Sequence, residues 1–143
     1  MSTEKTPIDD TELQKARTNA QEGSAHILVL ENQAARFFQA KEVIGALSWT
    51  AILGADSERI DLRYGHDVPN GLHTFDAKDL RPWYRAPDGE LYYSAIEGTI
   101  WLSVERPQFG MTFEHTGVLL NVRFEKGDGS FVVLNGTFRN AYT

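Results

Sequence analysis

The side chains best suited to hold a metal ion lie mostly in one stretch of the sequence. They are His66, Asp67, His73, Asp76 and Asp79, and His115 stands beside Glu114 further along the chain. Imidazole and carboxylate groups bind zinc, iron or manganese when two or three of them converge at about 2 Å from one point. We single out His66, His73 and Asp76 as candidate metal ligands, which would make the protein a metal-dependent enzyme.

The same residues also have a simpler interpretation. They flank the turn signal Pro69-Asn70-Gly71, where Asp and His side chains commonly hydrogen-bond to their own backbone. The sequence contains no His-x-His pair and no His-Glu-x-x-His motif that would fix a metal geometry. Solvated turn residues are therefore the alternative to a metal site.

Other catalytic chemistries lack their motifs. The sequence has no cysteine and no Gly-x-Ser-x-Gly, and its glycine pair around Asp128 is followed by neither a lysine nor a helix pattern. A glycosidase-like pair of carboxylates stays open, because 20 acidic residues offer many pairs. We expect no cofactor.

A loop rich in aromatic and basic residues is the first candidate for binding a ligand. It contains Arg81, Pro82, Trp83, Tyr84 and Arg85. Trp, Tyr and Arg often anchor interfaces, and prolines stiffen the loop that presents them. Alternatively, Trp83 and Tyr84 fold back under the loop and close an end of the protein.

Trp101 is the second candidate, because strict alternation along residues 91–105 places it away from the core. The same pattern predicts the inner side chains Ile96, Ile100, Leu102, Val104, Val118, Leu120, Val122, Phe124, Val132, Leu134 and Phe138. It predicts an outer patch of Trp101, Leu119, Phe131 and Val133, together with the polar Asn121 and Arg123. Such a patch is larger than a monomer usually exposes.

Three explanations for this patch stay open. The N-terminal segment or a loop covers it, or a bulge returns Trp101 to the core. The protein associates with itself through the face. The face binds an external partner, such as a sugar that stacks on the indole ring and hydrogen-bonds to Glu97 and Asn121.

The elements that must position these residues are strands. From Ser24 onward the hydrophobic pattern has a period of two, interrupted by Gly, Pro or Asp. We expect strands at residues 26–30, 35–43, 46–53, 58–64, 72–75, 91–105, 110–125 and 130–142, with reversals at Arg106-Pro107-Gln108 and at residues 126–129. The prolines of residues 76–89 argue against central-strand pairing there. This predicts an all-β fold, an antiparallel β-sandwich or flattened barrel of about eight strands.

A short internal sequence repeat occurs in two of the predicted strands. Glu97-Gly98-Thr99-Ile100 returns as Asn135-Gly136-Thr137-Phe138. We expect each glycine to point into the core, where it marks a bend or the close approach of a neighbouring sheet.

The N-terminal residues 1–23 differ from the single β-sandwich domain predicted for residues 24–143. They are polar and form either a tail or a short helix. Asp9 and Glu12 have the spacing of a capping box, Gly23 is a plausible stop, and Leu13, Ala16 and Ala20 form a thin apolar stripe.

Several of the strand motifs together resemble small bacterial all-β proteins of unknown function. The residues that carry the resemblance are Ile60-Asp61-Leu62-Arg63, the run from Val68 to Phe75, Tyr93-Ser94 with Gly98-Thr99-Ile100, and the run from Val132 to Phe138. The family tends to Pro-Gly-Thr where this chain has Asn70-Gly71-Leu72-His73, and to an export signal where this chain has a polar tail. The resemblance implies a β-sandwich over residues 25–142 and carries over no catalytic or ligand-binding residue.

Composition limits the partners. The chain has 143 residues and a formal net charge of −6, with 14 basic and 20 acidic residues and no basic run. A protein that binds nucleic acid needs a basic patch, so we expect no nucleic acid. No apolar stretch is long enough to span a membrane and no signal segment is recognisable, so we expect a cytoplasmic location. The leading hypothesis is a non-enzymatic binding or interaction module for a small molecule, a carbohydrate or a protein.

Overall fold

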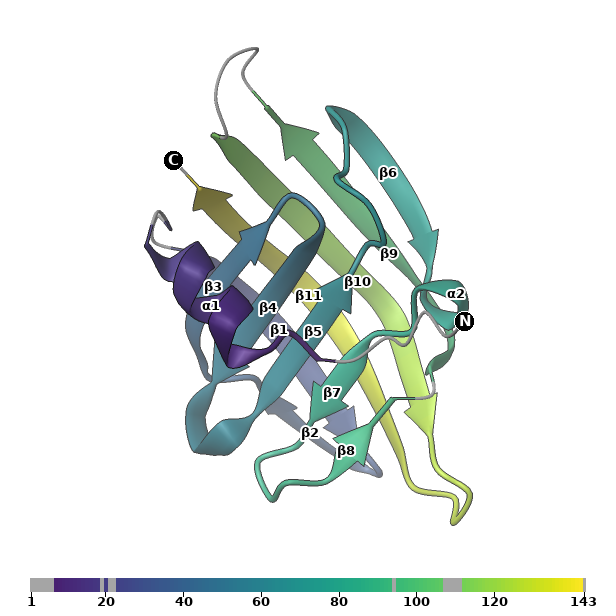
Figure 1. Ribbon diagram of the computed structural model, residues 1–143. Coiled ribbons are helices and arrows are strands. Elements are labelled where there is room, and N and C mark those ends of the chain that lie inside the picture. Colours follow the sequence, from purple (N-terminus) through teal and green to yellow (C-terminus); the bar gives the residue numbers. More distant parts are fainter. Residues whose placement is uncertain (1–6, 19, 21–22, 94, 107–111, 143) are drawn as a thin grey trace, which may run out of the picture.

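The computed structural model describes residues 7–18, 20, 23–93, 95–106 and 112–142. Two antiparallel sheets pack face to face and form a sandwich (Figure 1). The first sheet has the order β2 (Ala34–Phe37), β1 (Ser24–Glu31), β11 (Phe131–Tyr142), β10 (Phe113–Glu125), β9 (Ala95–Glu105), β6 (Gly71–Asp76). The second has the order β3 (Ala40–Ala46), β4 (Trp49–Gly54), β5 (Arg59–Arg63), β7 (Trp83–Arg85), β8 (Leu91–Tyr92).

The predicted all-β antiparallel fold is confirmed, although the described residues form eleven strands, because two predicted strands are divided and β7 lies in a segment for which no strand was predicted. The predicted strand 35–43 becomes β2 and β3, which belong to different sheets, and the predicted strand 91–105 becomes β8 and β9. The first and last strands pair with each other, from Ser24 opposite Arg139 to Glu31 opposite Val132. A long-range pairing therefore joins β1 and β2 to the other four strands of the six-stranded sheet. The predicted reversal at Arg106-Pro107-Gln108 includes residues outside the described part.

The expectation that prolines prevent central-strand pairing in residues 76–89 is wrong for part of that segment. Residues 77–80 form the short helix α2 (Ala77–Leu80), and β7 pairs with β5 on one side and β8 on the other. The strand has only three residues and lies between Pro82 and Pro87, so neither proline has to donate a hydrogen bond within it.

The core lies between the sheets and consists mainly of aliphatic side chains with Tyr64, Tyr84, Tyr92, Phe124 and Phe138. The inward positions of Ile60, Leu62 and Tyr64 are confirmed, since all three are buried. At the hairpin of residues 126–129, the Lys126 amide donates a hydrogen bond of 2.9 Å to the Ser130 carbonyl oxygen.

The predicted alternation of β10 is wrong in the first part of the strand. Leu119 is buried although we expected it outside, and Leu120 is 40% exposed although we expected it inside. The cause is a bulge between Leu119 and Val122, where Asn121 adopts a φ of 51° and shifts the phase by one residue. On β9, Ile96 is likewise exposed rather than buried, next to a second irregularity in the register.

The two glycines of the sequence repeat lie where neighbouring strands approach closely. Gly98 has a φ of 123° and Gly136 a φ of 153°. A side chain at Gly98 would meet the backbone of Val122, and one at Gly136 would meet the carbonyl of His26. The close approach is therefore made by the adjacent strand of the same sheet, whereas we expected either a bend or the close approach of a neighbouring sheet.

The described residues 8–17 of the N-terminal segment pack on the outer face of the five-stranded sheet (Figure 1). Helix α1 (Asp10–Arg17) begins with the predicted capping box, in which Asp9 accepts from the Glu12 amide and Glu12 accepts from the Asp9 amide. The helix ends at Arg17, before the predicted stop at Gly23. Its apolar contacts form a second, smaller core of Ile8, Leu13, Ala16, Ile44, Trp49 and Ala51. No helix in the described ranges is long and apolar enough to cross a bilayer.

Three charged contacts hold the N-terminal segment in place. Arg17 forms a bidentate pair with Glu42, and Arg63 forms one with Glu12. Asp61, which is 4% exposed, accepts a hydrogen bond of 2.8 Å from the Ile8 amide. The outward side chains of β5 therefore bind this segment instead of facing water.

Candidate binding sites

Trp101 lies on the outer face of the six-stranded sheet, as its alternation predicts, and is 38% exposed. It belongs to a row of directly opposed residues that crosses five strands. In strand order the row is His26, Thr137, Val118, Trp101 and Thr74. Exposed Leu72 and Leu120 lie diagonally next to it, on the strands that flank β9. The face therefore combines an aromatic centre with aliphatic and hydroxyl side chains.

Within the described part of the chain, neither the N-terminal helix nor a bulge takes Trp101 out of contact with solvent. Helix α1 covers the five-stranded sheet, and the bulge of β10 lies beyond the row and leaves Trp101 outside. The membership of the patch changes, because Leu119 is buried and Leu120 takes its place. Phe131 and Val133 point outward but are half-buried, and Arg123 lies 4.3 Å from the centre of the Phe131 ring.

The Trp83–Tyr84 segment folds back into the protein. Tyr84 is fully buried, and Trp83 is half-buried against the Tyr93 ring. Arg85 donates to the Ser57 carbonyl at 2.8 Å, while Arg81 is exposed at the end of α2. Of the candidates in this segment, Arg81 alone presents a largely exposed side chain to a partner.

Tyr84 is part of a buried charged network that sequence reasoning missed. The Tyr84 hydroxyl donates to Glu58, which is 2% exposed, and Arg36 reaches Glu58 at 2.7 Å and the Tyr84 oxygen at 2.9 Å. Arg36 also binds Glu31 at 3.1 Å. Burial, assisted by the Glu58 carboxylate, raises the pKa of Tyr84 well above its usual range. These residues come from three separate segments, so no spacing in the sequence indicates the network.

This network leads to a stability prediction. We expect Arg36→Met to lower the free energy of unfolding by about 3 kcal/mol, because it leaves the Glu58 carboxylate buried without its cation. Urea unfolding measures the change. The control is Arg123→Met, which removes the more exposed pair with Glu125 and should cost below about 1 kcal/mol. Equal losses in the two variants would contradict this account of Glu58.

The candidate metal ligands have local partners in the structure. The His73 ring nitrogen Nε2 lies 2.7 Å from the Pro69 carbonyl oxygen, and Asp76 caps α2 by accepting from the Lys78 amide at 2.9 Å. His66 and Asp67 are exposed. Within the described part of the chain, no three His, Asp or Glu side chains gather as a metal site requires. These local contacts are the ones expected if His73 and Asp76 are turn residues rather than metal ligands.

The interior contains a polar cluster of Thr50, Tyr64, His115 and Asn140. All are buried; Tyr64 and Thr50 share a hydrogen bond of 2.7 Å, and the His115 nitrogen Nδ1 lies 3.5 Å from the Thr50 hydroxyl. His115 and Asn140 are direct partners on β10 and β11. Within the described residues, His115 Nε2 and both amide atoms of Asn140 lack a hydrogen-bond partner. Burial, with a smaller effect of Arg106, lowers the pKa of His115 to about 4.

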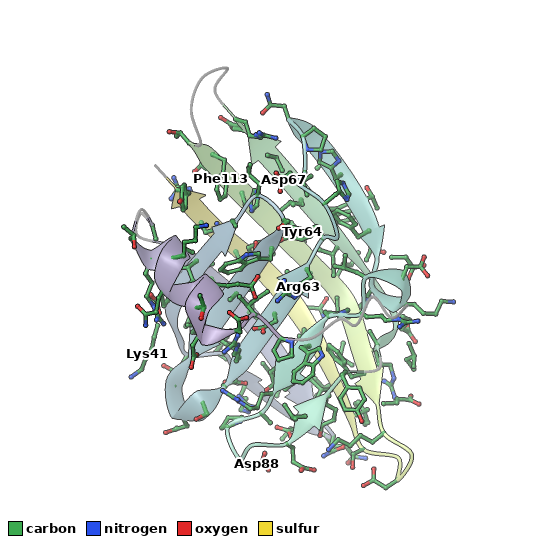
Figure 2. The ribbon with its side chains drawn as sticks, viewed as in Figure 1. Lys41, Arg63, Tyr64, Asp67, Asp88 and Phe113 are labelled. Carbon is green, nitrogen blue, oxygen red and sulfur yellow. The ribbon has the colours of Figure 1, made fainter. Side chains whose placement is uncertain are left out.

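A cavity of about 280 Å³ opens at the same end of the sandwich. Its apolar walls come from α1, β3, β4 and the outer ends of β10 and β11, and comprise Ala16, Ala46, Leu47, Trp49, Phe113 and Tyr142. Figure 2 shows Phe113 and Asp67 at this end of the molecule. Phe113 connects the cavity with the polar cluster, since its ring centre lies 4.6 Å from that of His115. The sequence pattern did not predict this cavity.

Comparison of the chain with family models, with curated proteins and with solved structures found no match.

Proposed function

We propose that the protein is a non-enzymatic binding module whose binding surface is the outer face of the six-stranded sheet. The observation that carries this proposal is the position of Trp101. A large aromatic side chain is 38% exposed within the sheet, while the N-terminal helix packs on the opposite sheet. An exposed apolar patch in a sheet face is typical of an interaction site.

A second copy of this chain is the partner that we propose. A residue in a sheet covers about 3.3 by 4.8 Å, so the six strands together present a face of about 850 Å². A stable standard-size interface needs about 800 Å² from each partner. Two such faces can stack at about 10 Å, as sheets do inside a sandwich.

The charges on the face favour contact with another copy. Arg123 and Glu125 form an ion pair of 2.9 Å, and Arg139 pairs with Glu114. Each arginine is thus already paired with a carboxylate of the same protein molecule, which limits the electrostatic repulsion between two identical surfaces. The exposed Leu28 and Phe37 are direct partners at the β1–β2 edge and extend the apolar area.

The self-association is tested by sedimentation equilibrium over a range of protein concentrations. We expect a dimer, and Trp101→Ala should weaken it about 30-fold, which corresponds to about 2 kcal/mol for a central aromatic residue. The control is Tyr93→Ala, because Tyr93 is 60% exposed but lies outside the six-stranded sheet. It should leave the dimer unchanged.

A protein that stays monomeric at every concentration would exclude the second copy as partner. The same face could then stack on a sugar, with the hydroxyl groups of Thr74 and Thr137 in the row beside Trp101. Titration with cellohexaose, followed by tryptophan fluorescence, examines this in wild type and Trp101→Ala. If neither dimer nor sugar binding depends on Trp101, this face is not the binding surface.

A further inference from the structure

We propose that the cavity at the end of the sandwich binds a small uncharged aromatic molecule of one or two rings that carries a hydrogen-bonding group. This site is separate from the Trp101 face. It lies between α1 and the outer ends of β10 and β11, and shares no residue with the row through Trp101.

The walls determine the shape of the ligand. Trp49, Phe113 and Tyr142 supply three aromatic rings, and Phe113 and Tyr142 are stacked with their centres 5.3 Å apart. Planar molecules pack well against such rings, either face to face with an offset or edge to face. A volume of about 280 Å³ is at the small end of ligand pockets and suits one or two rings.

The charges at the rim determine the charge of the ligand. Three charged side chains line the cavity, and Glu12 is already bound by Arg63 at 2.7 Å. Lys15 and Asp67 are left, and neither has an ion pair among the described residues. One positive and one negative charge give no net preference for an ion. A charged ligand would lose its hydration without a matching gain.

The polar cluster behind Phe113 indicates the hydrogen-bonding group. His115 Nε2 and the Asn140 amide are buried without a partner in the described part of the chain, and such atoms normally bind water or a ligand. His115 contacts the Phe113 ring that forms part of the cavity wall, but neither His115 nor Asn140 lines the cavity itself. A donor or acceptor on the ligand would therefore meet His115 Nε2 or the Asn140 amide through a bridging water molecule.

The test is a titration with indole, followed by the backbone amide signals of the ¹⁵N-labelled protein. We expect saturable shifts at residues 46–49, 113–115 and 140–142, and a change in the side-chain nitrogen signals of His115. Indole-3-carboxylate has the same ring system with a negative charge, and it should bind at least tenfold more weakly. Ala46→Leu, which fills the cavity, should weaken indole binding at least tenfold.

Ala34→Leu is the matched control, because Ala34 is exposed on β2, far from the cavity. It should bind indole as the wild type does. The proposal is overturned if indole shifts gather around Trp101 instead, if they do not saturate, or if a folded Ala46→Leu binds indole with unchanged affinity. Should Ala46→Leu fail to fold, the shift map of the wild type decides alone.

Discussion

Gly136→Ala is expected to prevent stable folding or to cost more than about 3 kcal/mol of unfolding free energy, whereas Gly127→Ala leaves it within about 1 kcal/mol. A Cβ at Gly136 would lie 2.1 Å from the His26 carbonyl oxygen and 2.6 Å from the Ile27 Cα. Both are backbone atoms, so no side chain can rotate away. The φ of 153° adds strain for any residue with a side chain.

Gly127 is the matched control, because a Cβ there has no neighbour within 4 Å and its φ is not in the left-handed region. Circular dichroism and urea unfolding of the two variants measure the difference. A Gly136→Ala protein as stable as the wild type would mean that β1 and β11 do not approach as closely as in this structure.

Acid is expected to destabilise the protein through His115 by about 3 kcal/mol between pH 6.5 and pH 4. Burial lowers the pKa of His115 in the folded protein from 6.5 to about 4. Above pH 6.5 the imidazole is neutral in both states, and its contribution to stability is complete. As the pH falls from 6.5 to 4, the unfolded chain binds a proton that the folded protein does not, so unfolding becomes more favourable.

The measurement compares the pH dependence of unfolding in wild type, His115→Gln and His26→Gln. His115→Gln should lose about 3 kcal/mol less than the wild type over this pH range, because glutamine does not titrate. His26 is exposed, so His26→Gln should follow the wild type. The three proteins contain the same carboxylates, so the comparison isolates the substituted histidine. Parallel curves for His115→Gln and wild type would show that His115 is protonated as easily when folded as when unfolded.

Strands and their buried faces could be predicted from the sequence wherever one uninterrupted alternation decides them. Ile60, Leu62 and Tyr64 are such a case, and the Asp9–Glu12 capping box is its helical counterpart. The assignment failed at Leu119 and Leu120, because a bulge inserts one residue there. After one extra residue, the side chains that the alternation places inside lie outside, and the reverse. Alternation also cannot tell which sheet receives a strand, so β2 and β3 were predicted as one.

The candidate sites were predictable only in part for a related reason. The outward position of Trp101 follows from its neighbours in the sequence and was predicted, whereas its exposure was left open. The contacts of Arg36, Glu58 and Tyr84 depend on how three distant segments meet, and the cavity depends on where α1 docks. Local patterns contain neither piece of information. The same holds for His115, whose burial is set by the facing sheet.

The pairing of β1 with β11 also bears on how the protein is made. During synthesis, β1 leaves the ribosome long before residues 131–142, which contribute its main neighbour in the six-stranded sheet. Until then the edge of β1 that β11 later occupies has unpaired backbone groups and is open to other extended chains. The six-stranded sheet is therefore completed only after residues 131–142 have been synthesised.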